Sequence, residues 1–115
     1  MADRELIYKI CSRAEWDQAV HDGLYRGSAD DARDGFIHLS RAHQVKATAA
    51  KYFAARTDLV LIAVHANALG PALRDEPSRG GDLFPHLYGE LPIAAARSVR
   101  PLVWDGSAHC WPDDL

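Results

Sequence analysis

The sequence has little cysteine, no block of charge of one sign and no long apolar segment. Cys11 and Cys110 lie near opposite ends without a C-x-x-C pair, which predicts reduced thiols in a cytoplasmic protein, although spacing alone leaves a disulfide open. The 13 basic and 16 acidic residues are mixed, with a net charge of −3, so no basic stripe indicates a nucleic-acid partner. The most apolar run, residues 59–68, is too short to cross a bilayer, so we expect no membrane-spanning segment.

Two kinds of chemistry are also missing from the local patterns. The six histidines form no H-x-x-x-H or H-E-x-x-H pair, so we expect no metal site from spacing. Convergence in space of His38, His65 or His86 with a glutamate, either Glu76 or Glu90, stays open. The serines lack the setting of a nucleophile elbow, so the pattern does not favour a hydrolase triad.

The 115 residues fit one domain, residues 1–115, with an irregular tail from about residue 105. A strand is predicted over 6–10. Ser12, with Glu15 three residues later, forms a capping box that predicts a helix, and Trp16 begins its apolar face. Gly23 is expected to end this helix.

The rest of the chain predicts strands around a second helix. Residues 27–33, rich in aspartate, are expected to form a surface loop, followed by a strand over 34–40 and a helix over 44–55. Residues 58–66 predict a central strand that is apolar on both faces. A long loop over 69–82, with a brief strand near 72–74, an extended segment over 84–89 and closing strands within 90–102 complete the order.

This order lacks regular βαβ alternation, so it favours an α+β domain with a mostly antiparallel sheet and two main helices over a doubly wound fold.

The strand over 34–40 is where we expect function to lie. Because side chains of a strand alternate, Phe36, His38 and Ser40 share one face, and Ile37 and Leu39 share the other, which is purely aliphatic. The alternative is that His38 is a half-buried histidine bonded to a neighbouring carbonyl.

A second polar cluster follows in the late part of the chain. His86 and Tyr88 share one face of an extended segment, and Glu76 and Glu90 flank it. A glutamate beside a sugar can stabilise an oxocarbenium-like centre or orient a ribose hydroxyl, and Arg79 can hold a phosphate. The alternative for these charged residues is a solvated role or pairing with nearby acids and bases.

Several motifs together resemble a family of small bacterial and fungal domains of unknown function, numbered nine-fifty-two in its series. The resemblance covers nearly the whole chain. Its motifs are Ile7-Tyr8-Lys9-Ile10 with Trp16, Gly35-Phe36-Ile37-His38-Leu39-Ser40 with Gln44, Glu76-Pro77 with Arg79-Gly80-Gly81, and Phe84-Pro85-His86-Leu87-Tyr88-Gly89-Glu90-Leu91-Pro92.

That family is in turn similar in layout to the ADP-ribosyltransferase fold, which includes poly-ADP-ribose polymerases and RNA 2′-phosphotransferases. The resemblance implies a split antiparallel sheet with NAD or an ADP-ribose-like group bound in a cleft. Phe36 or His38 then stacks on the nicotinamide, and Glu90 falls near the catalytic glutamate by order. The first strand departs from the pattern, because it offers Tyr8 and Lys9 in place of a His or Arg.

Two hypotheses follow. In the first, the chain is an ADP-ribosyltransferase-like domain that takes a nucleotide ligand, with NAD as a substrate. In the second, it is a non-catalytic small-molecule-binding or interaction module that keeps the fold. The expected catalytic residues are His38, His86, Glu76 and Glu90, and the expected substrate-binding residues are Phe36, Ser40, Arg79, Tyr88, Tyr8 and Lys9.

Overall fold

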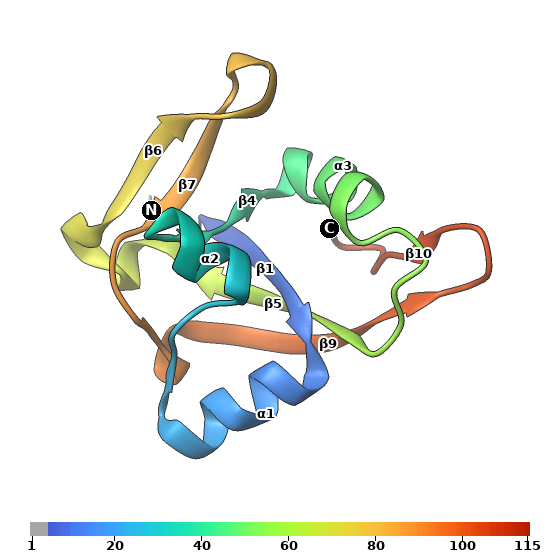
Figure 1. Cartoon of the computed structure of the whole chain (residues 1–115), viewed down its shortest axis with the longest axis horizontal. Helices are drawn as coiled ribbons and strands as arrows, with labels where there is room; N and C mark the ends of the chain where they lie inside the picture. The colour runs from blue at the N-terminus through green and yellow to red at the C-terminus, as the bar shows by residue number, and fades with distance from the viewer. Residues whose placement is uncertain (1–4) are drawn as a thin grey trace.

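Strand β5 (Leu59–His65) is the central strand of the main sheet. The structure is a computed structural model, and we describe its residues 5–115, apart from the side chain of Arg79. The sheet has the order β10-β9-β5-β1-β4 and is curled (Figure 1). Its other strands are β1 (Leu6–Ser12), β4 (Ser40–Arg41), β9 (Ala96–Trp104) and β10 (His109–Cys110). Because β5 has a paired neighbour on each side, its apolar run is buried throughout, as the sequence predicts.

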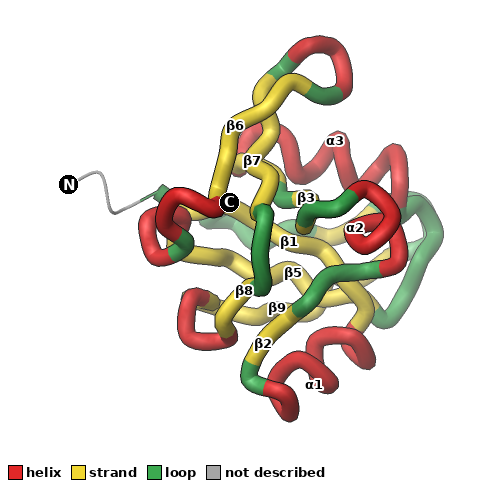
Figure 2. Tube along the Cα trace, turned by 60° about the vertical axis from the view of Figure 1, so that its left-hand side comes forward, coloured by secondary structure: helices red, strands yellow, loops and turns green. Residues whose placement is uncertain are grey.

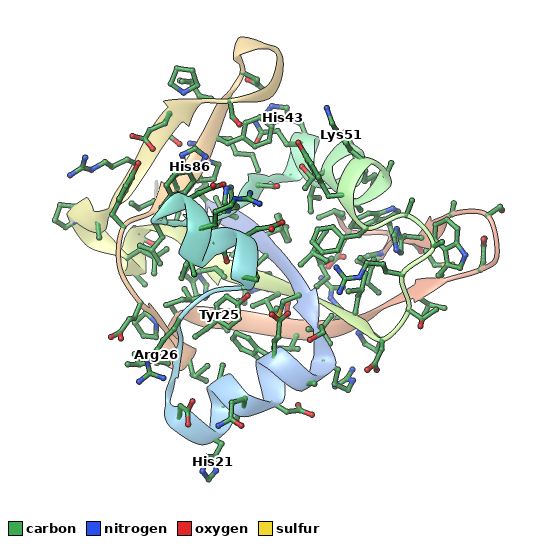
Figure 3. The ribbon with its side chains drawn as sticks, in the orientation of Figure 1. His21, Tyr25, Arg26, His43, Lys51 and His86 are labelled. Carbon is green, nitrogen blue, oxygen red and sulfur yellow. The ribbon has the colours of Figure 1, made fainter. Side chains whose placement is uncertain are left out.

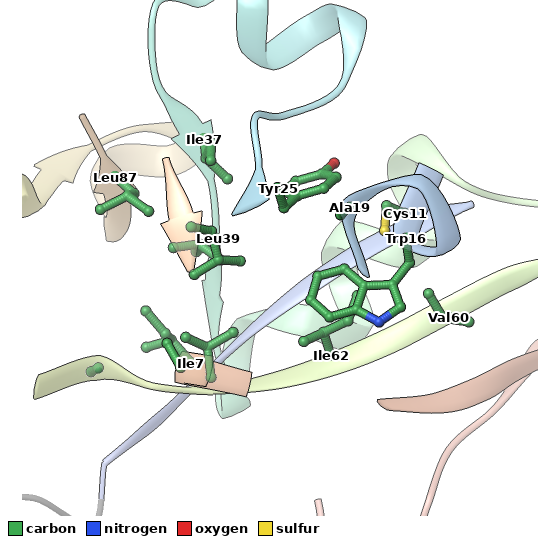
Figure 4. Close-up of a cluster of buried hydrophobic side chains, with 14 residues drawn as sticks. Ile7, Cys11, Trp16, Ala19, Tyr25, Ile37, Leu39, Val60, Ile62 and Leu87 are labelled. Atoms are coloured by element: carbon green, nitrogen blue, oxygen red, sulfur yellow. The ribbon is translucent and has the colours of Figure 1, made fainter. Parts of the chain in front are cut away.

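The two longest helices of the described chain cover opposite faces of this sheet. Trp16 and Ala19 of α1 (Arg13–Asp22) pack in one cluster with Val60, Ile62 and Val64 (Figure 4). Val45 and Ala49 of α3 (Ala42–Tyr52) pack in another with Leu59, Leu61 and Ala63. Since neighbouring residues of β5 point to opposite faces, the two clusters lie on either side of it.

Two smaller sheets flank the main one (Figure 2). One pairs β2 with β8, and the other has the order β3-β7-β6. Their strands are β2 (Leu24–Tyr25), β3 (Ile37–His38), β6 (Leu73–Pro77), β7 (Leu83–Leu87) and β8 (Leu91–Pro92). Short 3-10 turns lie between strands: η2 (Ala66–Ala68) and η3 (Gly70–Ala72) between β5 and β6, η4 (Arg79–Gly81) between β6 and β7, and η5 (Ile93–Ala95) between β8 and β9.

The strand pairings identified in residues 5–115 are all antiparallel. This confirms the predicted α+β class with antiparallel sheets and two main helices.

The predicted start and end of α1 are confirmed. The Ser12 hydroxyl accepts the Glu15 amide at 3.0 Å, and a Glu15 carboxylate oxygen accepts the Ser12 amide at 3.1 Å. Gly23 caps the other end with φ of 85°, a left-handed conformation that favours glycine.

The surface loop predicted over residues 27–33 is wrong, because most of it forms the helix α2 (Ala29–Asp34). Ser28 and Asp31 make a second capping box, and Gly35 ends the helix at φ of 86°. With six residues α2 is too short to display an apolar period, and its buried side chain is the carboxylate of Asp31. Hydropathy therefore could not reveal it.

The strand predicted over 34–40 is instead two short strands in different sheets, because the chain crosses from β3 to β4 at Leu39. The predicted aliphatic face is confirmed, since Ile37 and Leu39 are both buried. The tail is less irregular than expected, because β10 pairs with the end of β9. Both cysteines are free, and burial raises the pKa of the Cys11 thiol to about 12. None of the helices in residues 5–115 has the length and apolarity needed to span a membrane.

Candidate functional site

A cleft of about 260 Å³ lies where the main sheet meets the sheet of β3, β7 and β6. Strands β1 and β4 contribute to it from the main sheet and β3 and β7 from the smaller one, and α2 and α3 complete its walls. The polar side chains that line it include Tyr8, Lys9, Asp31, His38, Ser40 and His86.

A buried ion pair holds α2 against β1 at this cleft. Lys9 Nζ donates to Asp31 Oδ2 at 2.8 Å and to the carbonyl oxygen of His38 at 3.0 Å. Lys9 and Asp31 are both buried. Asp31 also accepts the backbone amides of Ser28 and His38, at 2.9 and 3.1 Å. One carboxylate therefore joins its own helix to β1 and β3.

The same contacts keep Asp31 ionised. Burial alone would raise the pKa of its carboxyl, because water no longer solvates the charge. The hydrogen bond from His38 and the charge of Lys9 more than offset that effect and hold the pKa of Asp31 below its ordinary value. Asp31 is thus a fixed anion in the wall of the cleft.

His38 is held by two carboxylates of α2. Its Nδ1 lies 2.6 Å from Asp31 Oδ1, and its Nε2 lies 2.9 Å from Asp34 Oδ2. Its side chain is 37% exposed, so the ring is at the cleft and not inside the apolar core. The contact with Arg33 and, more weakly, the one with His38 lower the pKa of Asp34.

The ring of His86, on β7, is oriented by a carboxylate of the neighbouring strand β6. Its Nδ1 lies 2.8 Å from Glu76 Oε1, and the hydroxyl of Tyr88 donates to the same oxygen at 2.7 Å. These hydrogen bonds, that from His86 first, lower the pKa of Glu76, and the bond to Glu76 raises the pKa of Tyr88. His86, labelled in Figure 3, is buried and lines the cleft, so a carboxylate fixes the orientation of its ring there.

Phe36 packs the two histidines together. Its ring is stacked on His86 with centroids 4.0 Å apart and tilted against His38 at 4.6 Å. The ring of Tyr88 lies 5.2 Å from it, and the two histidine rings are 5.8 Å apart. Aromatic contact thus fixes the spacing of His38 and His86, whichever ligand occupies the cleft.

The residues predicted from the sequence fall into three groups. Tyr8, Lys9, His38, Ser40 and His86 line the cleft. Phe36, Glu76 and Tyr88 do not line the cleft. Phe36 contacts both histidines, Glu76 contacts His86, and Tyr88 contacts Glu76 and Phe36. Glu90 and Arg79 form the third group.

Glu90 does not line the cleft, and its carboxylate pairs with Arg26 Nε at 3.4 Å. Figure 3 shows Arg26 well away from His86. The side chain of Arg79 lies outside the described residues. Asp31 was missed because residues 27–33 were expected to be a loop, and Asp34 was missed because it was expected to begin the strand over 34–40. The Ser28-x-x-Asp31 capping box was the one available signal.

The cleft carries charge of both signs. The lining holds Lys9 and Arg33 together with Asp30, Asp31 and Asp34. Within residues 5–115, no group of three or more His, Cys, Asp or Glu side chains is placed to hold a metal ion. The arrangement can accept hydrogen bonds from hydroxyl groups and transfer protons through the histidines.

Comparison with known proteins finds a matching family and similar solved structures. Residues 10–99 match the family described as "Protein of unknown function (DUF952)". The crystal structure of protein CC0527 from Caulobacter crescentus is 50% identical, with a TM-score of 0.87 over 90% of this chain and 91% of that one. Its solution NMR structure is 49% identical, with a TM-score of 0.81 over 95% and 91%. None of the curated proteins compared matches the chain significantly.

Proposed function

The chain belongs to the family "Protein of unknown function (DUF952)", and from its cleft we propose that it binds a nucleotide of the NAD or ADP-ribose type. The observation that carries the proposal is the convergence of two carboxylate-held histidines on one cleft beside a buried Lys9–Asp31 pair. A plain core or an ordinary surface seldom holds such a set of polar groups, whereas binding sites do.

The size and chemistry of the cleft lining favour a ribose as the part of the nucleotide that enters the cleft. The volume of about 260 Å³ is small for a whole dinucleotide and suits one ribose with the group on its anomeric carbon. Carboxylates such as Asp30 and Asp34 accept hydrogen bonds from ribose hydroxyls, and the ring of Phe84 offers an apolar surface to the group on the anomeric carbon. Because three carboxylates line the cleft, we expect the diphosphate to extend out of it.

The placement of the cleft between two sheets also supports the resemblance to ADP-ribosyltransferases. Residues 35–38 lead from α2 into β3 and bring Phe36 and His38 to its edge, where that resemblance expects an aromatic group. Glu90 does not fit the role of a catalytic glutamate there, because it lies outside the cleft lining and pairs with Arg26.

One observation favours the second candidate, a binding module without catalysis. Lys9 stands where the resemblance expects a ribose anchor, and its ammonium group is engaged by Asp31 and the carbonyl of His38. A ligand would have to displace one of these contacts to use it.

Thermal unfolding with ADP-ribose, NAD and adenosine tests binding. A ligand at about a hundredfold its Kd stabilises the folded state by about 2.7 kcal/mol, which is several degrees in Tm. We expect this shift with ADP-ribose for the wild type and for the control His21→Ala, whose side chain is exposed on α1 (Figure 3). His86→Gln, which keeps a hydrogen-bonding side chain beside Glu76, should lose most of it. A wild type that shifts with none of the three ligands would refute the proposal.

A further inference from the structure

We propose that His38 and His86 form an acid–base pair held in opposite protonation states, with His38 as the acid and His86 as the base. The inference rests on the proposed function and names its substrate class: a nucleotide whose ribose carries an O-linked group at the anomeric carbon. Such a bond needs a proton donor for its leaving oxygen.

The contacts of His38 define the acid. Both of its ring nitrogens lie on carboxylate oxygens, at 2.6 Å from Asp31 and 2.9 Å from Asp34. An imidazole donates from both nitrogens only when it is protonated, and a neutral ring would turn a lone pair toward one of these anions. The geometry therefore selects the imidazolium.

The contacts of His86 define the base. Its Nδ1 is within hydrogen-bond distance of Glu76, which accepts and therefore fixes the proton on Nδ1. Its Nε2 has no hydrogen-bond partner among the side chains and backbone that the structure describes, and the residue lines the cleft. A lone pair on Nε2 is thus available to accept a proton.

The charged groups around each ring differ. His38 faces Asp31 and Asp34 of α2 and, from β1, the Lys9 ammonium group. Arg33 also pairs with Asp34, so the direct contacts of both His38 nitrogens with carboxylates, and not an excess of negative charge, favour the imidazolium. His86 faces the Glu76 carboxylate, which Tyr88 also engages, and its cross-strand partner Arg74.

Because the two rings are 5.8 Å apart, a charge on His38 opposes a second charge on His86.

The step that follows is hydrolysis. A water oxygen bonds to the anomeric carbon and gives its proton to His86 Nε2, while the bond from that carbon to the leaving oxygen breaks and its electron pair stays on the oxygen. The leaving oxygen first takes the place of the partly exposed Asp34 carboxylate beside His38 Nε2. His38 Nε2 then gives its proton to that oxygen. Solvent then returns both rings to their starting states. The nicotinamide of NAD leaves without a proton, so this acid favours O-linked ribosides over NAD.

Nitrogen NMR of the free protein tests the protonation states without any ligand. At pH 7 we expect both His38 nitrogens to show protonated shifts, and His86 to show one protonated and one unprotonated nitrogen. In Asp34→Asn, the shift of His38 Nε2 at pH 7 should change because its carboxylate partner is lost, whereas Asp17→Asn on the exposed side of α1 should leave both histidines unchanged. A neutral His38 or a charged His86 at pH 7 would overturn the assignment.

Kinetics with two leaving groups tests the roles. ADP-ribose with an anomeric methoxy group needs the acid, and ADP-ribose with an anomeric 4-nitrophenoxy group does not. We expect His38→Gln to slow the methoxy compound at least about 100-fold and the nitrophenoxy compound less than about 10-fold, and His86→Gln to slow both.

Two results would overturn the inference. One is an equal loss on both compounds in His38→Gln. The other is a wild type that hydrolyses neither compound although ADP-ribose still raises its Tm. In that case the inference fails and the proposed binding function stands. Absence of that Tm shift instead overturns the proposed function itself.

Discussion

Helices α1 and α2 share their caps and differ in what holds them to the rest of the chain. Each follows a serine N-cap, has an acidic third residue that completes a capping box, and ends at a glycine in the left-handed region. These residues are Ser12, Glu15 and Gly23 in α1, and Ser28, Asp31 and Gly35 in α2. In α1 the buried side chains are Trp16 and Ala19, whereas in α2 the buried side chain is Asp31.

The apolar contacts of α1 mainly stabilise the fold, whereas the ion pair of α2 mainly fixes the position of the helix. An apolar anchor such as Trp16 stabilises the fold in proportion to its buried area and tolerates small shifts. A buried ion pair adds little net stability, but its hydrogen bonds define positions closely. The Asp31 carboxylate touches Lys9 and His38, so the anchor of α2 also sets the geometry of the cleft.

The largest effect should come from removing the apolar anchor. Trp16 is 4% exposed in the cluster beneath α1, so Trp16→Ala should cost about 3–5 kcal/mol of unfolding free energy through lost burial and a cavity. Urea denaturation measures this. The neighbouring exposed residue provides a control, because Asp17→Ala should stay within about 0.5 kcal/mol of the wild type. Near-normal stability of Trp16→Ala would mean that α1 is not anchored by its apolar face.

Removing the ionic anchor should cost somewhat less. Asp31→Asn leaves the buried Lys9 ammonium without its counter-charge, at a cost of about 3 kcal/mol. Adding Lys9→Met to this variant should restore part of the loss, because no uncompensated charge then remains. Urea denaturation of the two single variants and the double variant forms a cycle. Strictly additive losses would contradict the ion pair as the anchor of α2.

The same contrast explains which parts of the fold could be predicted. The α1 prediction rested on two agreeing signals, the cap at Ser12 and an apolar face that begins at Trp16. At α2 the cap at Ser28 stood alone, because the helix is anchored by a carboxylate and has no apolar face. Hydropathy periodicity reveals a helix only when the helix buries apolar side chains. A helix that is held by a buried carboxylate, such as α2, therefore cannot be predicted from it.

The candidate site was predictable within segments but not between them. Alternation correctly predicted that Ile37 and Leu39 are buried and that His38 lies at the cleft, although Leu39 contributes to the cleft lining as well. The partners of His38 and His86 depend instead on long-range packing and on sheet register, which places Glu76 beside His86 across β6 and β7. Order along the chain suggested Glu90 as well, but Glu90 lies at the end of a different sheet.

Acid should weaken the Lys9–Asp31 ion pair that holds α2. It should not affect the packing of Trp16 that holds α1, because the indole side chain does not titrate. The pKa of Asp31 is below its ordinary value in the folded state, so its stabilising contribution is complete above about pH 4 and is lost as the pH falls further. Each pH unit below the ordinary value costs about 1.4 kcal/mol. Between pH 7 and pH 3 the wild type should therefore lose about 1 kcal/mol more unfolding free energy than Asp31→Asn does. Urea denaturation of both proteins at pH 7, 5 and 3 measures the difference, and the comparison removes the acid response that other carboxylates share. Parallel pH curves for the two proteins would show that the Asp31 charge does not hold α2, and the distinction between the two helices would then rest on Trp16 alone.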